Sequence, residues 1–454
     1  MRFLNNRMGR ITALLALGGG TALIAQGVQT GNVAGTVKDA TTGKPISGAT
    51  VILKTPQGDR QTTSDAQGTF RFGLLSPENA QLVISAHGHI TASTNLRVNI
   101  GLTSTYDFTL KPIQETGAVV VVSAAESVID PSETKTGENY ALQDVNALPI
   151  NNRTITSIAS LTPGVSADSN GITIRGSQAT QVQYLVDGAD VMDPVTGGPA
   201  VRLNEEMLEE VQVVTGGASA EYGRFTGGVG NTTTKSGTNE FKGVARYDLT
   251  NLSWNAYNPL DRGAKGTYTF PNHTNTVQQY VFSGPIIKDH LFFVVGYRTT
   301  SPQTSTPQST TGLDGTGNPI GIPNAATRSE ERKDIKLDWQ INENNRVFWQ
   351  YNKTDSKRRN IDYPTMFGYG STTVDTLSSQ NDTFSYVTFG YLGQISSNLL
   401  LSARFNQKKE TLGGLVPAMT FTAGQKSAPL LSCVYFTILS DKGWTAPNGS
   451  KAVC

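Results

Sequence analysis

The sequence is poor in the residues that bind metals and form disulfide bridges. It contains two cysteines, Cys433 and Cys454, and four histidines in 454 residues. Two cysteines exclude a disulfide-rich scaffold and a metal site built from several thiolates, and so few histidines argue against a histidine-based catalytic metal site. The Gly-x-Ser-x-Gly and His-Glu-x-x-His motifs of hydrolases are also absent. We therefore expect a protein that is not an enzyme and that uses no metal or cofactor.

The sequence also has almost no net charge and few long apolar segments. Lys and Arg number 37 and Asp and Glu 36, so the formal net charge is +1 and nucleic acid is not expected as a partner. One apolar run, residues 11–25, follows a basic start and ends at a small-x-small triplet, which predicts a signal peptide over residues 1–27. A membrane anchor is the alternative, but ~15 apolar residues are fewer than the ~20 that a spanning helix needs.

Glycine and small polar residues are abundant instead. Glycine contributes 47 residues and charged residues make up only 16% of the chain. Average proteins have about 7% glycine and about 25% charged residues. The surplus of glycine and uncharged polar residues favours a mostly β, exported protein with many turns.

Residues 31–112 show short apolar strands separated by turns. Strands are expected near Val33, at 49–53, 69–72, 82–84 and 106–110, with turns at 43–45 and 64–68. The segment resembles the carboxypeptidase regulatory-like domain, a small β-sandwich, through Gly43, Pro45, Gly48, Ala49, Asp65, Gly68, Phe70, His87 and Gly88. No acidic residue lies close to His87 and His89 in the sequence, so this segment is not expected to bind zinc as an enzyme would.

Residues 130–237 carry an ordered series of short motifs. They lie at 148–153, 161–165, 172–176, 184–188, 209–217, 220–223 and, across the junction with the next segment, 234–241. Each is weak alone, but in this order they resemble the plug domain of TonB-dependent outer-membrane transporters, of the Oar-like type that also carries the sandwich. The resemblance implies a compact domain that folds inside a barrel.

The resemblance also implies which residues matter. The plug motifs contribute residues with structural and gating roles, namely Arg175, Gly176, Asp187, Gly188, Glu221, Tyr222 and Gly223. The charged members would have to be paired in a crowded interior, because an unpaired buried charge is costly.

A short β-branched run precedes the plug. Taken alone, residues 117–124 would be one more strand of the sandwich. Beside a plug they are expected to be the TonB box, in which Val119, Val120, Val121 and Val122 add as a strand to a TonB-type energising protein in the periplasm.

Two other chemical interpretations of the plug region fit poorly. A glycine-rich segment before Lys235 suggests a phosphate-binding loop, but Thr234 stands where that motif needs glycine. Asp187, Asp190 and Asp193 recur at every third residue, whereas an EF-hand calcium loop uses alternate positions. A solvated turn is the better expectation for these aspartates.

From residue 239 on, apolar and polar residues alternate. In the clearest case Ile335, Leu337, Trp339 and Ile341 alternate with polar residues, and similar runs lie at 241–249, 291–297, 347–352 and 399–405. Short turns at 284–289, 342–345 and 396–398 alternate with long polar stretches at 251–276, 299–331 and 354–382. That alternation is typical of a transmembrane barrel with tight periplasmic turns and long outer loops, here with about seven strands. Tyr297, Trp339, Trp349 and Tyr351 are candidates for its aromatic girdles.

A barrel of this family has 22 strands around a plugged lumen. Residues 239–454 would form only its first part, so we expect the chain to be an N-terminal fragment of a longer protein. Cys433 and Cys454 would fall in an outer loop, where they form a disulfide or are an incidental pair.

These expectations define a fold class and a function. The fold is mostly β: an N-terminal β-sandwich, a plug domain and the first ~7 strands of a transmembrane antiparallel β-barrel. Such a protein would lie in the outer membrane of a Gram-negative cell, with lipid around the strands and the sandwich in the periplasm. It would take up a scarce ligand (a siderophore, oligosaccharide or peptide) bound at its outer loops, by energised rearrangement of the plug. The alternative is a surface adhesin or matrix-interaction protein of the same architecture.

Overall fold

The computed structural model describes most of the chain between residues 29 and 415. The described residues are 29–113, 125–126, 135–148, 154–167, 171–193, 198–199, 202–218, 222–223, 225–251, 254, 274–304, 312–313, 319–320, 327–362, 377–396 and 399–415. The chain divides into two compact units, one of residues 1–307, 327–358 and 381–413 and one of 308–326, 359–380 and 414–454. Within the second unit, β20 (Gly312–Leu313) pairs with β21 (Pro319–Ile320). The features below belong to the first unit unless a strand runs out of it.

The N-terminal segment is a sandwich of two four-stranded sheets. One sheet has the order β4 (Thr69–Leu75), β1 (Gly31–Asp39), β7 (Thr103–Leu110), β8 (Ala125–Glu126), and the other β3 (Gly58–Thr63), β2 (Thr50–Thr55), β5 (Asn79–Ser85), β6 (Ala92–Arg97). Strands β1 and β7 run parallel. Every second side chain faces the other sheet, so Val33, Val51, Leu82 and Phe108 are buried in one core.

Asp39 and His89 form an ion pair at one end of the sandwich. Asp39 ends β1, 50 residues from His89, and its Oδ2 atom lies 2.8 Å from His89 Nε2. The hydrogen bond holds the pKa of Asp39 well below its usual range and raises the pKa of His89. No acidic residue is close to His89 in the sequence, as noted above, but the fold brings Asp39 next to it. In the described part of the chain no three His, Cys, Asp or Glu side chains come together as a metal site would need.

The plug is built on a mixed five-stranded sheet. Its order is β13 (Ala189–Asp190), β12 (Val182–Val186), β15 (Gly228–Thr234), β14 (Leu208–Gly216) and β9 (Thr136–Ala141), with β12 parallel to β15. The other plug elements are α2 (Leu142–Ala147), α3 (Ile155–Ala159), β10 (Val165–Ala167), β11 (Ile172–Ile174), η2 (Ala179–Gln181) and η3 (Glu205–Met207). The glycine-rich segment before Lys235 is strand β15 rather than a loop, which removes the phosphate-loop interpretation.

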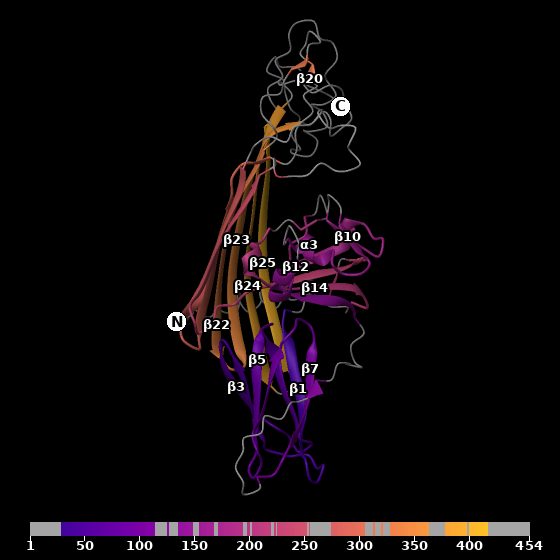
Figure 1. Ribbon diagram of the computed structural model, residues 1–454, viewed down its shortest axis with the longest axis vertical. Helices are drawn as coiled ribbons and strands as arrows, with labels where there is room; N and C mark the ends of the chain where they lie inside the picture. The colour runs from indigo at the N-terminus through magenta and orange to yellow at the C-terminus, as the bar shows by residue number, and fades with distance from the viewer. Residues whose placement is uncertain are drawn as a thin grey trace, which may run out of the picture. The chain divides into compact units, whose positions relative to one another are not determined.

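The remaining strands form one continuous wall. An eight-stranded sheet takes β16 (Lys242–Asn251), β17 (Thr274–Ile287), β18 (Leu291–Thr300), β22 (Thr327–Asn342), β23 (Asn345–Asp362), β24 (Leu377–Ser396) and β25 (Leu399–Leu415) in sequence order, and β19 (Gln303–Thr304) pairs with β22. Figure 1 shows β22 to β25 as long neighbouring strands. Neighbours in sequence are neighbours in space, as in an up-and-down barrel.

The wall buries its polar face and exposes its apolar face. In β22 the side chains of Asp334, Lys336 and Asp338 are 1%, 3% and 1% exposed, whereas Trp339 and Ile341 are 51% and 41% exposed. A soluble sandwich would show the reverse, because its apolar face is the core. The inverted pattern is that of a transmembrane barrel wall, with lipid outside and a polar interior, so the predicted fold class is confirmed. No described helix is long and apolar enough to cross a membrane.

Strand ends differ most from the predicted turns and loops in two places. Strand β17 continues through Gly284 and Pro285 to Ile287, so the first turn is narrower than 284–289 and centres on Asp289, whose φ is 64°. Strands β23 and β24 are 18 and 20 residues long and occupy much of the stretch predicted as the loop 354–382. A spanning strand needs only ~9–11 residues, so these strands are long enough to extend beyond the hydrocarbon layer.

Aromatic rings occur on the exposed, apolar side of the wall. Trp349 and Tyr351, which the sequence nominated for a girdle, stack with ring centroids 6.5 Å apart. A second group next to the β17–β18 turn was not predicted. There Phe241 and Phe282 stack 5.9 Å apart, and both rings are exposed. Exposed stacked rings at the end of strands suit a membrane–water interface.

Candidate functional site

Asp187 joins the plug to the wall. It sits in the turn between β12 and β13 with φ 46°, followed by Gly188 with φ 71°, and this left-handed pair points the carboxylate back toward β15. Asp187 accepts hydrogen bonds from the backbone N of Thr234 (3.1 Å) and from its hydroxyl (2.5 Å). The Nζ atom of Lys336 on β22 lies 3.4 Å from Asp187 Oδ1 and donates to the Thr234 carbonyl at 3.0 Å. Residues 149 positions apart thus form one buried polar contact.

The burial of Asp187 corrects one expectation. Asp187 and Asp193 are 3% and 9% exposed, so these aspartates do not form a solvated turn. For Asp187 the reason is the cation on the facing wall strand, since a buried carboxylate is retained only when it is paired and hydrogen-bonded.

A charge network joins η3 of the plug to the wall. Arg332 on β22 lies 3.0 Å from Glu205 Oε1, donates to the Leu203 carbonyl and pairs with Glu330. Further members are Arg298, 3.1 Å from Glu205 Oε2, and Arg202, 3.0 Å from Glu330 Oε2. Both carboxylates and Arg332 are buried. Three arginines and two glutamates from the plug and two wall strands therefore pair in a place that water reaches poorly, and both carboxylates are compensated.

Arg346 connects three parts of the molecule. Its guanidinium donates to Asp338 of β22 at 2.5 Å, to the Ser236 hydroxyl at the end of the plug at 2.8 Å, and to the Ser76 hydroxyl of the sandwich. A guanidinium has five donors in a planar fork, so one side chain can serve several acceptors.

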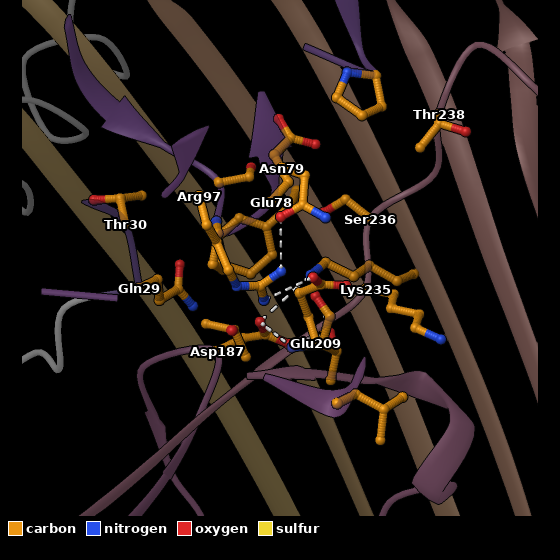
Figure 2. Close-up of a pocket in the computed structure, with 18 of the residues that line it drawn as sticks. Gln29, Thr30, Glu78, Asn79, Arg97, Asp187, Glu209, Lys235, Ser236 and Thr238 are labelled. Atoms are coloured by element: carbon orange, nitrogen blue, oxygen red, sulfur yellow. Dashed lines mark hydrogen bonds and ion pairs between the residues drawn. The ribbon is translucent and has the colours of Figure 1, made fainter. Parts of the chain in front are cut away.

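A polar cavity of about 390 Å³ lies beside this junction. Figure 2 shows Glu78, Asn79 and Arg97 of the sandwich facing Asp187, Glu209 and Lys235 of the plug and its C-terminal extension. Arg97 donates to Glu209 at 3.2 Å and to Asn79 at 3.4 Å. Lys336 and Arg346 complete the lining from the wall.

The plug also clamps one peptide of the sandwich. Ile100, between β6 and β7, donates its backbone N–H to Glu210 at 3.1 Å, and its carbonyl accepts from Gln212 at 2.8 Å and from Asn139 at 3.2 Å. Glu210 and Gln212 lie on β14 and Asn139 on β9. We call these four residues the Ile100 clamp.

The carboxyls at this interface have raised pKa values. Burial disfavours the ionised form and raises the pKa of Glu210 from 4.5 to about 7, against the opposing hydrogen bond from Ile100. Burial likewise raises the pKa of Glu78 from 4.5 to about 8, although the nearby Arg346 charge opposes the shift. Between pH 4.5 and these values the folded state holds protons that the unfolded state has released.

The held protons predict a pH dependence of the interface. Where the folded state binds more protons, stability falls as pH rises, so the contribution of both carboxyls is complete below about pH 4.5 and is lost as pH rises through 7 and 8. We expect the free energy of unfolding of the sandwich, from urea titrations, to be larger at pH 5 than at pH 8.5. Glu210→Gln, which stays neutral, is expected to flatten this slope, and an unchanged slope in that variant would contradict the assignment to Glu210.

The sequence-predicted residues are distributed as follows. Asp187 and Gly188 form the contact with Lys336, and Tyr222, which precedes Gly223, is buried with Leu185 and Val214. Arg175 was expected in a crowded interior but is exposed: it has φ 51°, precedes Gly176 and donates to the Thr215 hydroxyl at 3.4 Å. Glu221, the four valines 119–122 and the two cysteines lie outside the described residues.

Sequence reasoning missed the partners on the other side of each contact. The sequence pattern places Lys336 and Arg346 on polar strand faces without indicating a partner, and it does not single out Arg332. Arg332 and Lys336 are four positions apart on β22, an even spacing that places them on one face, and that face meets the plug; Arg346 lies on the next strand, β23. The pairing with Asp187 and Glu205 needs the fold, because the partners are more than 120 residues apart.

Two family models match the chain. Residues 32–111 match the carboxypeptidase regulatory-like domain, and residues 138–229 match the TonB-dependent receptor plug domain. Both resemblances drawn from the sequence motifs are thereby confirmed.

Related proteins are found among curated sequences and solved structures. The TonB-dependent transporter Oar of Myxococcus xanthus is 30% identical over 316 residues, which cover 64% of this chain, and the chain spans 29% of its length. The outer membrane transporter YddB from Escherichia coli has a TM-score of 0.46 at 17% identity, covering 60% of this chain and 38% of YddB. The siderophore receptor PirA from Pseudomonas aeruginosa has a TM-score of 0.41 at 19% identity, covering 61% of this chain and 41% of PirA.

Proposed function

We propose that this chain, which combines a carboxypeptidase regulatory-like domain with the plug domain of TonB-dependent receptors, belongs to an energised outer-membrane transporter. The intact protein would bind a scarce ligand, such as a siderophore, an oligosaccharide or a peptide, at its outer loops. No covalent chemistry takes place. A pull from the periplasm rearranges the plug, and the ligand passes between plug and wall.

The observation that carries this proposal is how the plug contacts the wall. Asp187–Lys336 and the network around Arg332 are ion pairs and hydrogen bonds. When a plug segment moves, water can replace such partners, whereas separating a large apolar interface would expose surface that water does not compensate. The polar part of this contact can thus be firm at rest and still yield to force, beside apolar contacts of the plug with Phe384 and Tyr386 and of Met207 with Val281.

The partner and the location follow from the same proposal. A TonB-type energising protein in the periplasm would pair with Val119 to Val122, because an extended β-branched segment suits strand addition. Lipid of the outer membrane would surround the apolar face of the wall, and the sandwich would lie in the periplasm. Arg175, Gly176, Asp187, Gly188, Glu221, Tyr222 and Gly223 would keep the plug in shape and take part in gating.

Deletion of residues 118–124 tests the proposal. In the intact protein this deletion is expected to abolish energy-dependent accumulation of the ligand and to leave its binding at the cell surface intact, because the outer loops and plug are untouched. The measurement is uptake of a labelled ligand with and without the membrane potential. Undiminished uptake in the deletion variant would disprove the role of this segment. Binding without any energy-dependent accumulation in the wild type would favour the adhesin alternative.

A further inference from the structure

We infer that the sandwich is a cover for the exit from the transporter: it closes the polar cavity between plug and wall, and it must separate from the plug before a ligand can leave through that cavity. This inference rests on the proposed transport function and gives the sandwich a role in it.

The cavity is formed by three parts of the chain together. Glu78, Asn79 and Arg97 line it from the sandwich, Asp187, Glu209 and Thr233 from the plug, and Lys336, Arg346 and Phe348 from the wall. Its volume of about 390 Å³ lies within the ~300–1,000 Å³ of small-ligand sites. A space of this size with charged walls suits water and polar solutes.

The sandwich sits on the cavity through polar contacts. These contacts include the Ile100 clamp, Arg97 with Glu209, Arg346 with Ser76, Asn79 with Gln143, Lys135 with the Gly101 carbonyl, Gln57 with the Gly237 carbonyl at 3.2 Å, and the Asn239 backbone N–H with the Pro56 carbonyl at 2.9 Å. Each of them joins the sandwich to the plug, to residues 237–239 that follow the plug, or to the wall.

The apolar cores show that this contact can open. The core of the sandwich and the core of the plug are separate clusters among the described residues. The plug core, by contrast, continues into the wall through Phe384 and Tyr386 of β24. Lifting the sandwich therefore breaks hydrogen bonds that water can replace, and leaves both apolar cores closed.

The plug makes two separate contacts at the cavity, one with the wall and one with the sandwich. Asp187 holds the plug to Lys336 of the wall, and Glu209 holds it to Arg97 of the sandwich; Figure 2 shows both carboxylates of the plug at the cavity. Displacing the plug from the wall alone would enlarge a space that the sandwich still closes. Release of a ligand then needs the second contact to open as well.

Accessibility of a cysteine in the cavity tests the cover. Thr233 lines the cavity, is 2% exposed and has a hydroxyl without a hydrogen-bond partner in the structure. We therefore expect Thr233→Cys to cost little free energy of unfolding. In the intact protein with Cys433 and Cys454 replaced by serine, its labelling by a membrane-impermeant maleimide is measured from the periplasmic side. We expect the double substitution Glu209→Ala and Glu210→Ala to raise the labelling rate about tenfold, the factor for a lost hydrogen bond to a charged group.

The matched control is Glu138→Ala. Glu138 is an exposed acid on β9 of the same plug sheet, so its removal changes the charge without touching the cover, and the labelling rate should stay at the wild-type value. Equal labelling in the double variant and in the control would overturn the inference. Ligand binding at the cell surface checks that each variant is folded.

Tethering the cover gives the second test. Arg97→Cys and Glu209→Cys, joined by a short bis-maleimide, should abolish energised uptake while surface binding persists, and each single cysteine treated with the same reagent should transport normally. Uptake that continues in the tethered protein would overturn the inference. Failure of the proposed function looks different, because wild-type uptake would then not depend on energy at all.

Discussion

Replacing Lys336 by methionine is expected to lower the free energy of unfolding of the plug by roughly 3–5 kcal/mol, the usual cost of removing one partner of a buried ion pair. Lys336 and Asp187 are both 3% exposed. Methionine fills a similar volume, so the loss comes from the Asp187 carboxylate, which would stay buried without its cation. The urea dependence of plug protection from a protease, measured on the intact protein in its membrane, gives the free energy.

Two further variants isolate this effect. Lys333→Met changes a lysine three positions away on the same strand, but Lys333 and its partner Glu331 are 49% and 39% exposed, so the expected loss is about 0–1 kcal/mol. Asp187→Asn combined with Lys336→Met removes both charges and should recover most of the stability. If Lys336→Met and Lys333→Met proved equally stable, Asp187–Lys336 would not be the contact that holds the plug.

Replacing Arg332 by methionine is expected to lower the free energy of unfolding of the plug by about 3 kcal/mol, because two buried carboxylates lose a cation that they share and keep only Arg298 and the partly exposed Arg202. Glu205 and Glu330 are both buried, and Arg332 pairs with each of them. Their mutual repulsion should free η3 and make the segment after Arg202 sensitive to protease. Protease cleavage of the plug, followed against urea concentration, measures the change.

Arg328→Met is the matched control for Arg332. Arg328 also pairs with Glu330, at 3.2 Å, but its side chain is 37% exposed, so water can replace it and the expected loss stays below about 1 kcal/mol. A stability of Arg332→Met within that range would mean that the network around Glu205 does not fasten the plug.

Sequence patterns predicted the elements whose signal is local. The alternation around Ile335 and Trp339 predicted a two-faced strand, and the succession of short and long connections indicated a barrel rather than a sandwich, because a soluble sandwich seldom needs three long loops. Strands β3 and β6 of the sandwich were not predicted, because their own sequences carry little strand signal. Both lie at sheet edges and consist mostly of polar residues, so they carry little alternation to detect.

The sequence predicts that buried charges of the plug are paired, but not which residues of the wall pair with them. The argument that Asp187 must be paired is an energetic one and holds for any buried carboxylate, but it does not say which of many lysines and arginines supplies the charge. It also failed for Arg175, because a left-handed turn at the surface places this side chain in solvent. Choosing Lys336 requires the register of β22 against the plug, which depends on the whole assembly.

The network around Arg332 constrains how this protein can change over generations. Glu205 and Arg332 are 127 positions apart, yet reversing either charge alone leaves like charges facing each other in a buried site, which costs far more than a single exchange on the surface. Substitutions at these positions should therefore become fixed in pairs. Among homologous sequences we expect positions 205, 330 and 332 to covary, and positions 331 and 333, on the opposite face of the same strand, to drift independently of the plug.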